Sequence, residues 1–296
     1  MNDKIKIVYD METNDPDDPM TLALLATHPR VDLIGVTVVP GSIEQMKFVR
    51  GVLDQLGRED VTIGSGDPDR DEGGINVKSY QRLFGGWNDE IPTVWPAKTL
   101  LEDLFRNNPD TTLVTGAPMK NMKDLEVYPY QWVGQGGFAG DSVVPDEFRL
   151  DKFRGMETCP TFNFNGCPEG AFNLLNAPIH TRMLVSKNVC HGIVYDTKMH
   201  DCVVPYRGCH AGLDFVMDAM ERYLERRDGK KWHDPLAACC AIDPHCCEFK
   251  EVEVYREKGK WGSRLQRGTD TFISVRAHYF RMISVMAGME ISDDQT

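Results

Sequence analysis

Short apolar runs alternate with segments of helical periodicity along the first 120 residues. Strand-like runs occupy 5–9, 31–39, 61–63 and 112–115, and helix-like segments occupy 20–27, 43–56 and 100–106. Continuous apolar strands that are separated by helices are typical of a parallel sheet covered on both faces. The pattern therefore predicts an α/β protein with an open, mainly parallel Rossmann-like sheet and helices on both faces.

The second half of the chain continues this alternation less regularly. Strand-like runs fall at 131–133, 183–185, 252–255 and 272–275, and helix-like segments at 167–175, 212–226, 235–242 and 278–289. Two segments, near 67–96 and 141–166, break the rhythm, and the first is rich in Asp, Gly and Pro. We interpret both as lids or insertions within a single domain that spans 1–296, because no linker-like boundary is evident.

Composition excludes several classes of protein. The chain has 296 residues and a formal net charge of −12, which argues against binding to a nucleic acid polymer. No apolar run approaches the ~20 residues of a bilayer span, and Met1 to Lys6 is polar, without a secretory signal. Nine scattered cysteines, an odd number, favour reduced thiols. We therefore expect a cytoplasmic protein that does not bind membranes.

Two adjacent cysteine pairs, Cys239-Cys240 and Cys246-Cys247, raise the question of a metal site. Adjacent cysteines seldom direct four thiolates at one ion, and the usual zinc signature is a CxxC knuckle. Core packing is the simpler interpretation for Cys239 and Cys240, which lie in an apolar run.

Polar clusters follow the predicted strands at 10–18, 40–42, 115–118 and 135–140. In open parallel sheets, ligands bind beyond the carboxyl ends of the strands. These clusters therefore predict one ligand site at that edge of the sheet.

The first of these clusters is the most informative. It places five carboxylates in nine residues, from Asp10 to Asp18, between a buried strand and an apolar helix. So many like charges cost Coulomb energy unless a cation neutralises them, and carboxylates are preferred ligands of Ca²⁺ and Mg²⁺. Helix capping by Asp17 or Asp18 is the alternative, but it explains one or two acids and not five.

Several motifs, in order along nearly the whole chain, resemble those of the inosine-uridine preferring nucleoside hydrolases. The acidic segment is similar to that family's DxDxGxDD motif, and the strand 34–41 to its second strand. Three further segments are similar to the family's central GPLTN turn, its FNxxxDPEAA segment and its HDPLA motif, and these are 113–121, 162–171 and 232–237.

The resemblance implies a ribonucleoside substrate, hydrolysis of its N-glycosidic bond and a bound Ca²⁺ at the floor of a ribose pocket. It implies that Asp10 or Glu12 is both a ligand and the base for a bound water, that Asp18 is a bidentate ligand and that Asp234 completes the shell. A main-chain carbonyl, that of Lys120, would add an oxygen.

The same resemblance implies roles beyond the ion. Asp17 and Asn163 would contact the ribose, Asn165 would also bind substrate, and His233 would protonate or orient the departing base. Members of the family are commonly dimers or tetramers, so a homodimer or homotetramer is expected.

The chain departs from the family pattern at several positions. The acidic motif is one residue longer, so that Glu12 takes the place of the second Asp. Whether Glu12 or Asp15 replaces part of the usual ligand pattern is open from the sequence. Ser42 stands where a ribose-binding Asn is usual, and Thr161 where a Glu usually holds the 5′-hydroxyl. Retained metal ligands with changed sugar contacts predict an altered substrate, such as a modified or 5′-substituted nucleoside.

The sequence does not decide which aromatic residue stacks on the base. Trp87, Trp95, Tyr223 or Trp232 could stack on it or pack in a lid.

Two other functions remain as alternatives to nucleoside hydrolysis. A haloacid dehalogenase-type phosphatase has DxDx[TV] after its first strand, compared here with 10–13, but this leaves the other motifs unexplained. A nucleoside-binding protein that has lost turnover is favoured by the changed sugar contacts.

Overall fold

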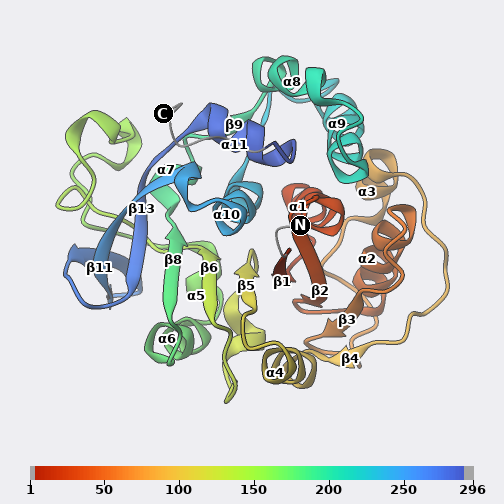
Figure 1. The fold of residues 1–296 in the computed structure, drawn as a ribbon, viewed down its shortest axis with the longest axis horizontal. Coiled ribbons are helices and arrows are strands. Elements are labelled where there is room, and N and C mark those ends of the chain that lie inside the picture. Colours follow the sequence, from red (N-terminus) through yellow and green to blue (C-terminus); the bar gives the residue numbers. More distant parts are fainter. Residues whose placement is uncertain (1–3, 290–296) are drawn as a thin grey trace.

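The computed structural model describes residues 4–289, and these build one large central sheet (Figure 1). From β4 to β13 every neighbouring pair of strands is parallel, whereas β11, β12 and β7 continue the sheet antiparallel. The fold is the predicted mainly parallel α/β fold. In order across the sheet, the strands are β4 (Trp95–Pro96), β3 (Thr62–Ser65), β2 (Val31–Val38), β1 (Ile5–Met11), β5 (Thr112–Thr115), β6 (Gln131–Gln135), β8 (Thr181–Val185), β13 (Thr271–Ala277), β11 (Cys247–Glu257), β12 (Lys260–Leu265) and β7 (Thr158–Cys159).

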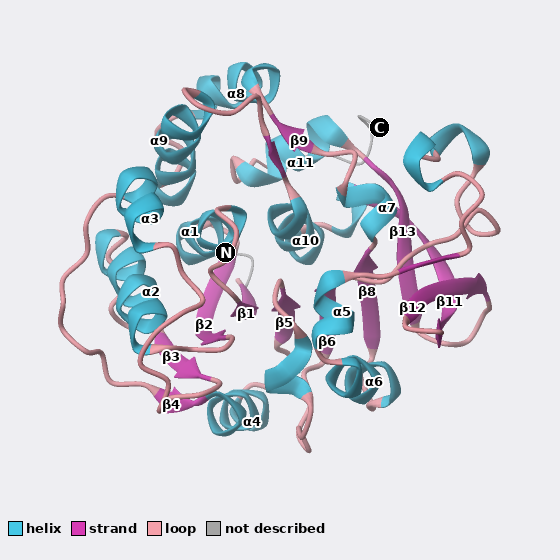
Figure 2. Cartoon of the chain, turned by 180° about the vertical axis from the view of Figure 1, so that it is seen from behind, coloured by secondary structure: helices cyan, strands magenta, loops and turns pink. Residues whose placement is uncertain are grey.

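Helices cover both faces of the parallel part of the sheet, as the sequence predicted. Figures 1 and 2 show α1, α2 and α10 on one face and α4 and α6 on the other. A two-stranded sheet of β9 (Val194–Tyr195) and β10 (Lys230–Lys231) lies apart from the main one. The helices are α1 (Asp17–Thr27), α2 (Ile43–Gln55), α3 (Val77–Phe84), α4 (Ala97–Asn107), α5 (Phe162–Gly166), α6 (Pro168–Asn176), α7 (Lys187–Cys190), α8 (Thr197–Val203), α9 (Ala211–Leu224), α10 (His233–Ile242) and α11 (Tyr279–Met286).

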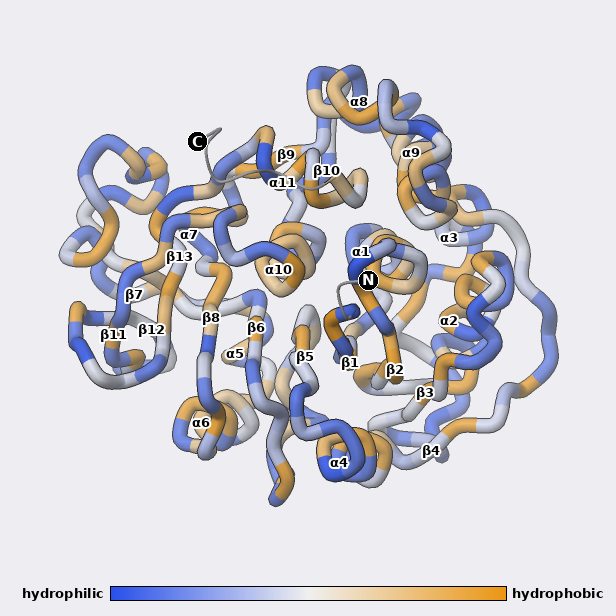
Figure 3. The backbone as a smooth tube through the Cα atoms, viewed as in Figure 1, coloured by the Kyte–Doolittle hydropathy of each residue, from blue (hydrophilic) through white to orange (hydrophobic). Residues whose placement is uncertain are grey.

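The apolar runs are buried between these layers. Ile7, Val8 and Tyr9 of β1 have no exposed surface, because helices cover both faces of that strand. Figure 3 shows α10 coloured mostly as hydrophobic, and its Leu236 and Cys240 are likewise fully buried. A helix that is apolar on all sides is stable only inside a protein. Central packing therefore fixes β1 and α10, which carry the two ends of the acidic site.

Several elements were not predicted from the pattern. β11 contains the predicted strand 252–255, but β12 was not predicted, and the hairpin that joins them turns at Lys258-Gly259, where both residues have positive φ. The segment 67–96 contains α3, and 141–166 contains β7, α5 and two short 3₁₀ turns at Asp146–Phe148 and Asp151–Phe153. These elements are short or carry charged residues on one exposed face, so they show no continuous apolar run.

The paired cysteines 239, 240, 246 and 247 are all buried in the core. Among the described residues, no three His, Cys, Asp or Glu side chains converge closely enough to hold a metal ion as they stand. The cysteines therefore pack as small apolar side chains, and burial raises the pKa of the Cys239 thiol above its ordinary value.

Candidate active site

A cavity of about 290 Å³ opens at the carboxyl ends of β1, β5 and β6, next to the first residues of α1 and α10. Its position is the one that ligand sites take in open parallel sheets. Acidic residues from both ends of the chain meet there. The lining residues are Glu12, Asn14, Asp15, Asp17, Asp18, Gly116, Gln135, Phe162, Asn163, His233 and Asp234.

Asp10 lies at the end of β1 and is completely buried. Its Oδ1 accepts hydrogen bonds from the Thr37 hydroxyl at 2.6 Å and from Asn121 Nδ2 at 2.7 Å. Its Oδ2 has no partner within the described part of the chain. Burial raises the pKa of Asp10 to about 7, against the two hydrogen bonds that favour the anion. A buried carboxylate oxygen without a partner is costly, so this atom is available to a ligand.

Asp18 and Asp234 lie against each other, although 216 positions separate them in the chain. Tyr9 donates its hydroxyl to Asp234 Oδ2 at 3.3 Å. A Cβ at Gly116 would lie 2.2 Å from the same Oδ2, so only glycine allows this close approach. Burial raises the pKa of both carboxyls well above the ordinary value. Repulsion from Asp234 raises that of Asp18 further, whereas repulsion from Asp17 raises that of Asp234 and its hydrogen bond with Asp18 lowers it.

Asp17 and Asp15 share a cationic partner inside the protein. The buried Lys230 ammonium lies 2.9 Å from Asp17 Oδ1 and 2.9 Å from Asp15 Oδ2. Asp17 Oδ2 also accepts from the backbone N–H of His233 at 3.1 Å and of Asp234 at 3.3 Å. The Asp17 carboxylate thus fixes the start of α10 against that of α1, and its charge is neutralised without a metal.

Glu12 is the remaining carboxylate of the acidic segment and is 7% exposed. Its Oε2 accepts from Asn14 Nδ2 at 2.7 Å, and burial raises the pKa of its carboxyl to about 7. Lys120 is exposed and does not line the cavity, and its carbonyl accepts from the Lys123 N–H at 3.4 Å.

The donor chemistry of the cavity fits a hard divalent cation. Five carboxylates line it, beside the amides of Asn14, Gln135 and Asn163 and the imidazole of His233. Asp10 is not part of the lining, but its buried Oδ2 atom lacks a partner within residues 4–289. No three of these acids are preassembled around one point within residues 4–289. A cation would therefore bind together with rotation of the Asp10, Asp18 or Asp234 side chain.

The predicted sugar-binding residues divide into two groups. Asn163 lines the cavity, and its Nδ2 donates to Gly116 O at 3.0 Å and to Gln135 Oε1 at 2.7 Å. Ser42, Thr161 and Asn165 do not line it. Ser42 caps α2 in a capping box with Gln45, and its hydroxyl donates to a loop carbonyl. Asn165 accepts from Trp261 Nε1 at 2.8 Å, and the buried Thr161 hydroxyl has no partner in the described chain.

His233 faces the cavity at the first turn of α10. Its Nε2 is buried and has no partner among the described residues, and its ring stacks on His191 with centroids 5.0 Å apart. Burial lowers the pKa of His233 to about 4, so the imidazole is neutral at pH 7.

A scan against protein families matches residues 7–278 to the inosine-uridine preferring nucleoside hydrolases. The chain belongs to this family. Nucleoside hydrolases cleave the N-glycosidic bond between base and ribose, and the family match removes the phosphatase alternative. A comparison with curated proteins found no match.

Solved structures of nucleoside hydrolases share this fold. A plant nucleoside hydrolase has 17% sequence identity and a TM-score of 0.69, and the match covers 96% of this chain and 98% of that one. A purine-preferring ribonucleoside hydrolase from Gardnerella vaginalis (16%, TM-score 0.65) and an inosine-uridine preferring nucleoside hydrolase from Bacillus anthracis (16%, TM-score 0.66) each cover 96% of this chain and 99% of their own.

The aromatic side chain at the cavity of this nucleoside hydrolase is Phe162, which is 69% exposed. The aromatic residues that sequence reasoning considered lie elsewhere. Trp232 is fully buried, Trp87 packs on Phe48 with ring centroids 4.8 Å apart, and neither Trp95 nor Tyr223 lines the cavity. Phe162 directly precedes Asn163, which was predicted to bind the sugar. This position in the sequence was the signal from which Phe162 could have been predicted at the cavity.

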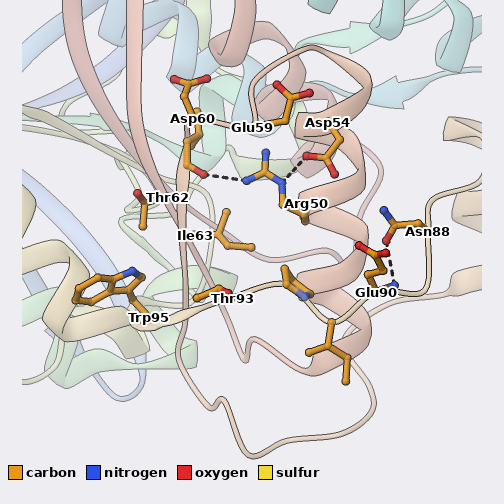
Figure 4. A pocket seen from close by; sticks show the side chains of 13 residues that line it. Arg50, Asp54, Glu59, Asp60, Thr62, Ile63, Asn88, Glu90, Thr93 and Trp95 are labelled. Atoms are coloured by element: carbon orange, nitrogen blue, oxygen red, sulfur yellow. Dashed lines mark hydrogen bonds and ion pairs between the residues drawn. The ribbon is translucent and has the colours of Figure 1, made fainter.

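A larger cavity of about 480 Å³ lies at the other end of the sheet, between α2, β3 and the loop before β4 (Figure 4). Its Arg50 is already paired, with Asp54 at 2.6 Å and with the carbonyls of Val61 and Arg58. The stacking candidate Trp95 lines it, but none of the predicted catalytic, sugar-binding or metal-ligating residues does. Size alone therefore does not make it the active site of the nucleoside hydrolase.

Four functional contacts were missed by sequence reasoning. Thr37 and Gln135 had a usable signal, since each is a polar residue in or at the end of an apolar strand. Asn121 lies in the segment compared with the family's central turn. Lys230 had no signal, because it reaches Asp15 and Asp17 from the far end of the chain.

Among the described residues, no helix is long and apolar enough to cross a membrane.

Proposed function

We propose that this nucleoside hydrolase uses Ca²⁺ to hydrolyse the N-glycosidic bond of a ribonucleoside or modified ribonucleoside, which releases the free base and the ribose. The observation that carries the proposal is the cavity at the carboxyl edge of the sheet. It gathers Asp17, Asp18 and Asp234 from both ends of the chain. Asp10, whose carbonyl accepts from the N–H of Gly116 in the lining at 2.8 Å, has a buried Oδ2 without a partner in the described chain.

Asp10, Asp18 and Asp234 would hold the cation, with the Lys120 carbonyl, Glu12 or Asp15 supplying further oxygens. Their oxygen-only chemistry favours Ca²⁺ over softer metals. When bound, the cation would bind a water and the ribose hydroxyls and lower the pKa of that water.

The residues of the chain then divide the remaining work. Asp10 Oδ2 takes the proton from the attacking water, and Glu12 is the alternative base. The carboxylate floor stabilises the positive charge that grows on the ribose as the bond breaks. Asp17 and Asn163 hold the sugar, and His233 offers Nε2 to the departing base.

The sugar contacts support an altered substrate. The Ser42 hydroxyl caps α2, and Thr161 is not part of the cavity lining. We therefore propose a modified or 5′-substituted nucleoside. A single domain, a cytoplasmic location and a homodimer or homotetramer stay predictions.

The test is a panel of plain, base-modified and 5′-substituted nucleosides, with release of free base as the readout. We expect release that depends on Ca²⁺ and is faster for a substituted member than for inosine or uridine. Fast turnover of plain inosine and uridine, with no better substrate in the panel, would contradict the altered substrate.

The base is tested by Asp10→Asn and Glu12→Gln. Because Asp10 Oδ2 has no other partner, Asp10→Asn is expected to abolish turnover, and unchanged activity would pass the role to Glu12. The changed sugar contacts also favour a second function, a nucleoside-binding protein without turnover. Calorimetric binding of a nucleoside with no detectable hydrolysis would support that function.

A further inference from the structure

The rim of the active-site cavity carries a group of basic side chains that the reaction does not use. We call Lys152, Lys187, Lys231 and His191 the rim cluster. Lys231 Nζ lies 3.3 Å from Nδ1 of His191, and Lys152 Nζ contacts the same nitrogen. Because both lysines donate to Nδ1, the imidazole is neutral and its proton sits on Nε2.

One contact joins the rim cluster to the cavity lining directly, and two more join residues next to them in the chain. The ring of His191 stacks on that of His233. Lys187 Nζ donates to Pro160 O at 2.8 Å, two residues before Phe162 of the lining. Cys190, next to His191, accepts from Gln135 Nε2 at 3.3 Å. The rim cluster thus borders the cavity between Phe162 and His233, where α7 lies beside α10 (Figure 1).

The rim cluster brings several basic groups close together. Within residues 4–289, no carboxylate forms an ion pair with Lys152, Lys187, Lys231 or His191, although the chain as a whole carries a net charge of −12. The pKa of Lys152 is lowered, first by burial and then by the positive charges of Lys231 and Lys187. Ammonium groups held together in this way repel each other, and a bound anion would relieve that repulsion.

We propose that the rim cluster binds an anionic group of the substrate, a phosphate ester or a carboxylate, so that this nucleoside hydrolase prefers a negatively charged nucleoside. The proposal rests on the proposed function, because the rim cluster borders that active site. Lysine is a common phosphate ligand, and three ammonium donors beside one cavity suit several anionic oxygens. The acidic floor would bind the sugar of the substrate, and the rim cluster would bind its anionic group.

The test compares three probes: a neutral nucleoside, its 5′-monophosphate and a nucleoside with a carboxylate on the base. Binding is measured by calorimetry in the presence of Ca²⁺, and release of free base is measured separately. We expect one anionic probe to bind at least ~10-fold more tightly than the neutral one, and which of the two does so identifies the source of the charge.

Variants assign this preference to the rim cluster. In Lys152→Gln combined with Lys231→Gln, the preference for the anionic probe should fall about 10-fold or more. Lys152→Arg combined with Lys231→Arg should keep most of it, because the charge is retained. Lys198 is an exposed lysine on α8, and Lys198→Gln, which removes one positive charge away from the cavity, should leave the preference unchanged.

Equal binding of all three probes, or a preference that survives the double Gln variant, would overturn the proposal. The assay of base release keeps this failure distinct from failure of the proposed function. Anionic binding without any hydrolysis contradicts the catalytic role alone, and hydrolysis without anionic preference contradicts the rim cluster alone.

Discussion

The floor and the rim of one cavity carry opposite charges, and each is left partly unneutralised. On the floor, Asp17 is paired with the buried Lys230, whereas Asp18 and Asp234 face each other. On the rim, Lys152 and Lys231 share a neutral imidazole nitrogen, and neither has a carboxylate partner among residues 4–289. Folding alone favours compensated charges inside a protein. From the difference between Asp17 and the other two acids, we expect a ligand to supply positive charge at Asp18 and Asp234.

The largest expected effect is on catalysis by Asp18→Asn. Loss of a ligand of the cation should lower the rate of base release at least ~1000-fold. The same change removes the repulsion with Asp234, so the Ca²⁺-free protein should gain roughly 1–2 kcal/mol in free energy of unfolding. Base release and denaturant unfolding with chelator measure the two effects.

Asp17→Asn is the matched change within the same cluster. It removes a charge that Lys230 compensates, so the free energy of unfolding should fall by about 2–4 kcal/mol. Asp17→Asn should therefore lower the free energy of unfolding, whereas Asp18→Asn should raise it in the Ca²⁺-free protein. Asp17→Asn and Asp18→Asn changing stability in the same direction would show that the two acids do not differ in this way.

Bound Ca²⁺ should neutralise the unpaired acids of the floor and so stabilise the folded protein. At about 100 times its dissociation constant, a bound ion adds ~2.7 kcal/mol, which corresponds to a rise in Tm of roughly 5 °C or more. Asp18→Asn should lose this rise, and Asp54→Asn, in the other cavity, should keep it. Thermal unfolding with and without Ca²⁺ gives the result, and an equal rise in both variants would place the ion elsewhere.

The effect of pH on stability can be tested at a histidine that lies outside both the acidic floor and the rim cluster. His28 is buried, its Nε2–H donates to Val285 O at 2.8 Å, and burial lowers its pKa to about 4. The unfolded chain takes up the proton near pH 6.5, so stability falls as the pH drops from there towards 4.

His28→Gln should therefore lose about 2 kcal/mol less than the wild type between pH 7 and pH 5 in denaturant unfolding. His180→Gln removes an exposed histidine and should keep the wild-type slope. An unchanged slope in His28→Gln would mean that His28 is not held neutral by burial.

The smallest expected effect concerns Phe162, which lies between floor and rim. Loss of an aromatic ring that stacks on a base costs about 1–3 kcal/mol, so Phe162→Ala should raise KM about 10-fold and change kcat little. Phe280→Ala removes a ring of similar exposure on α11 and should leave KM unchanged. A fall in kcat at constant KM would instead place Phe162 in the chemical step.

The floor could be predicted from the sequence because its acids follow a buried strand and precede buried helices. That local order places Asp10, Asp18 and Asp234 at one edge of the sheet. Ser42 was assigned to the sugar, although Ser42 and Gln45 form the S-x-x-Q signature of a capping box, as the structure shows.

The rim could not be predicted, because its residues come from separate segments. Lys152 lies in the irregular segment 141–166, His191 follows α7, and Lys231 lies in β10. None is unusual locally, and only tertiary packing brings them together. The same holds for Lys230, whose partners Asp15 and Asp17 lie more than 200 positions away.

The most direct test of the central claim is base release by chelated protein before and after Ca²⁺ is restored, with a substrate from the nucleoside panel. The acidic floor predicts background release without the ion, full release after reloading, and background release in Asp18→Asn under both conditions. Equal release by the chelated and reloaded protein would contradict a floor built to hold a cation.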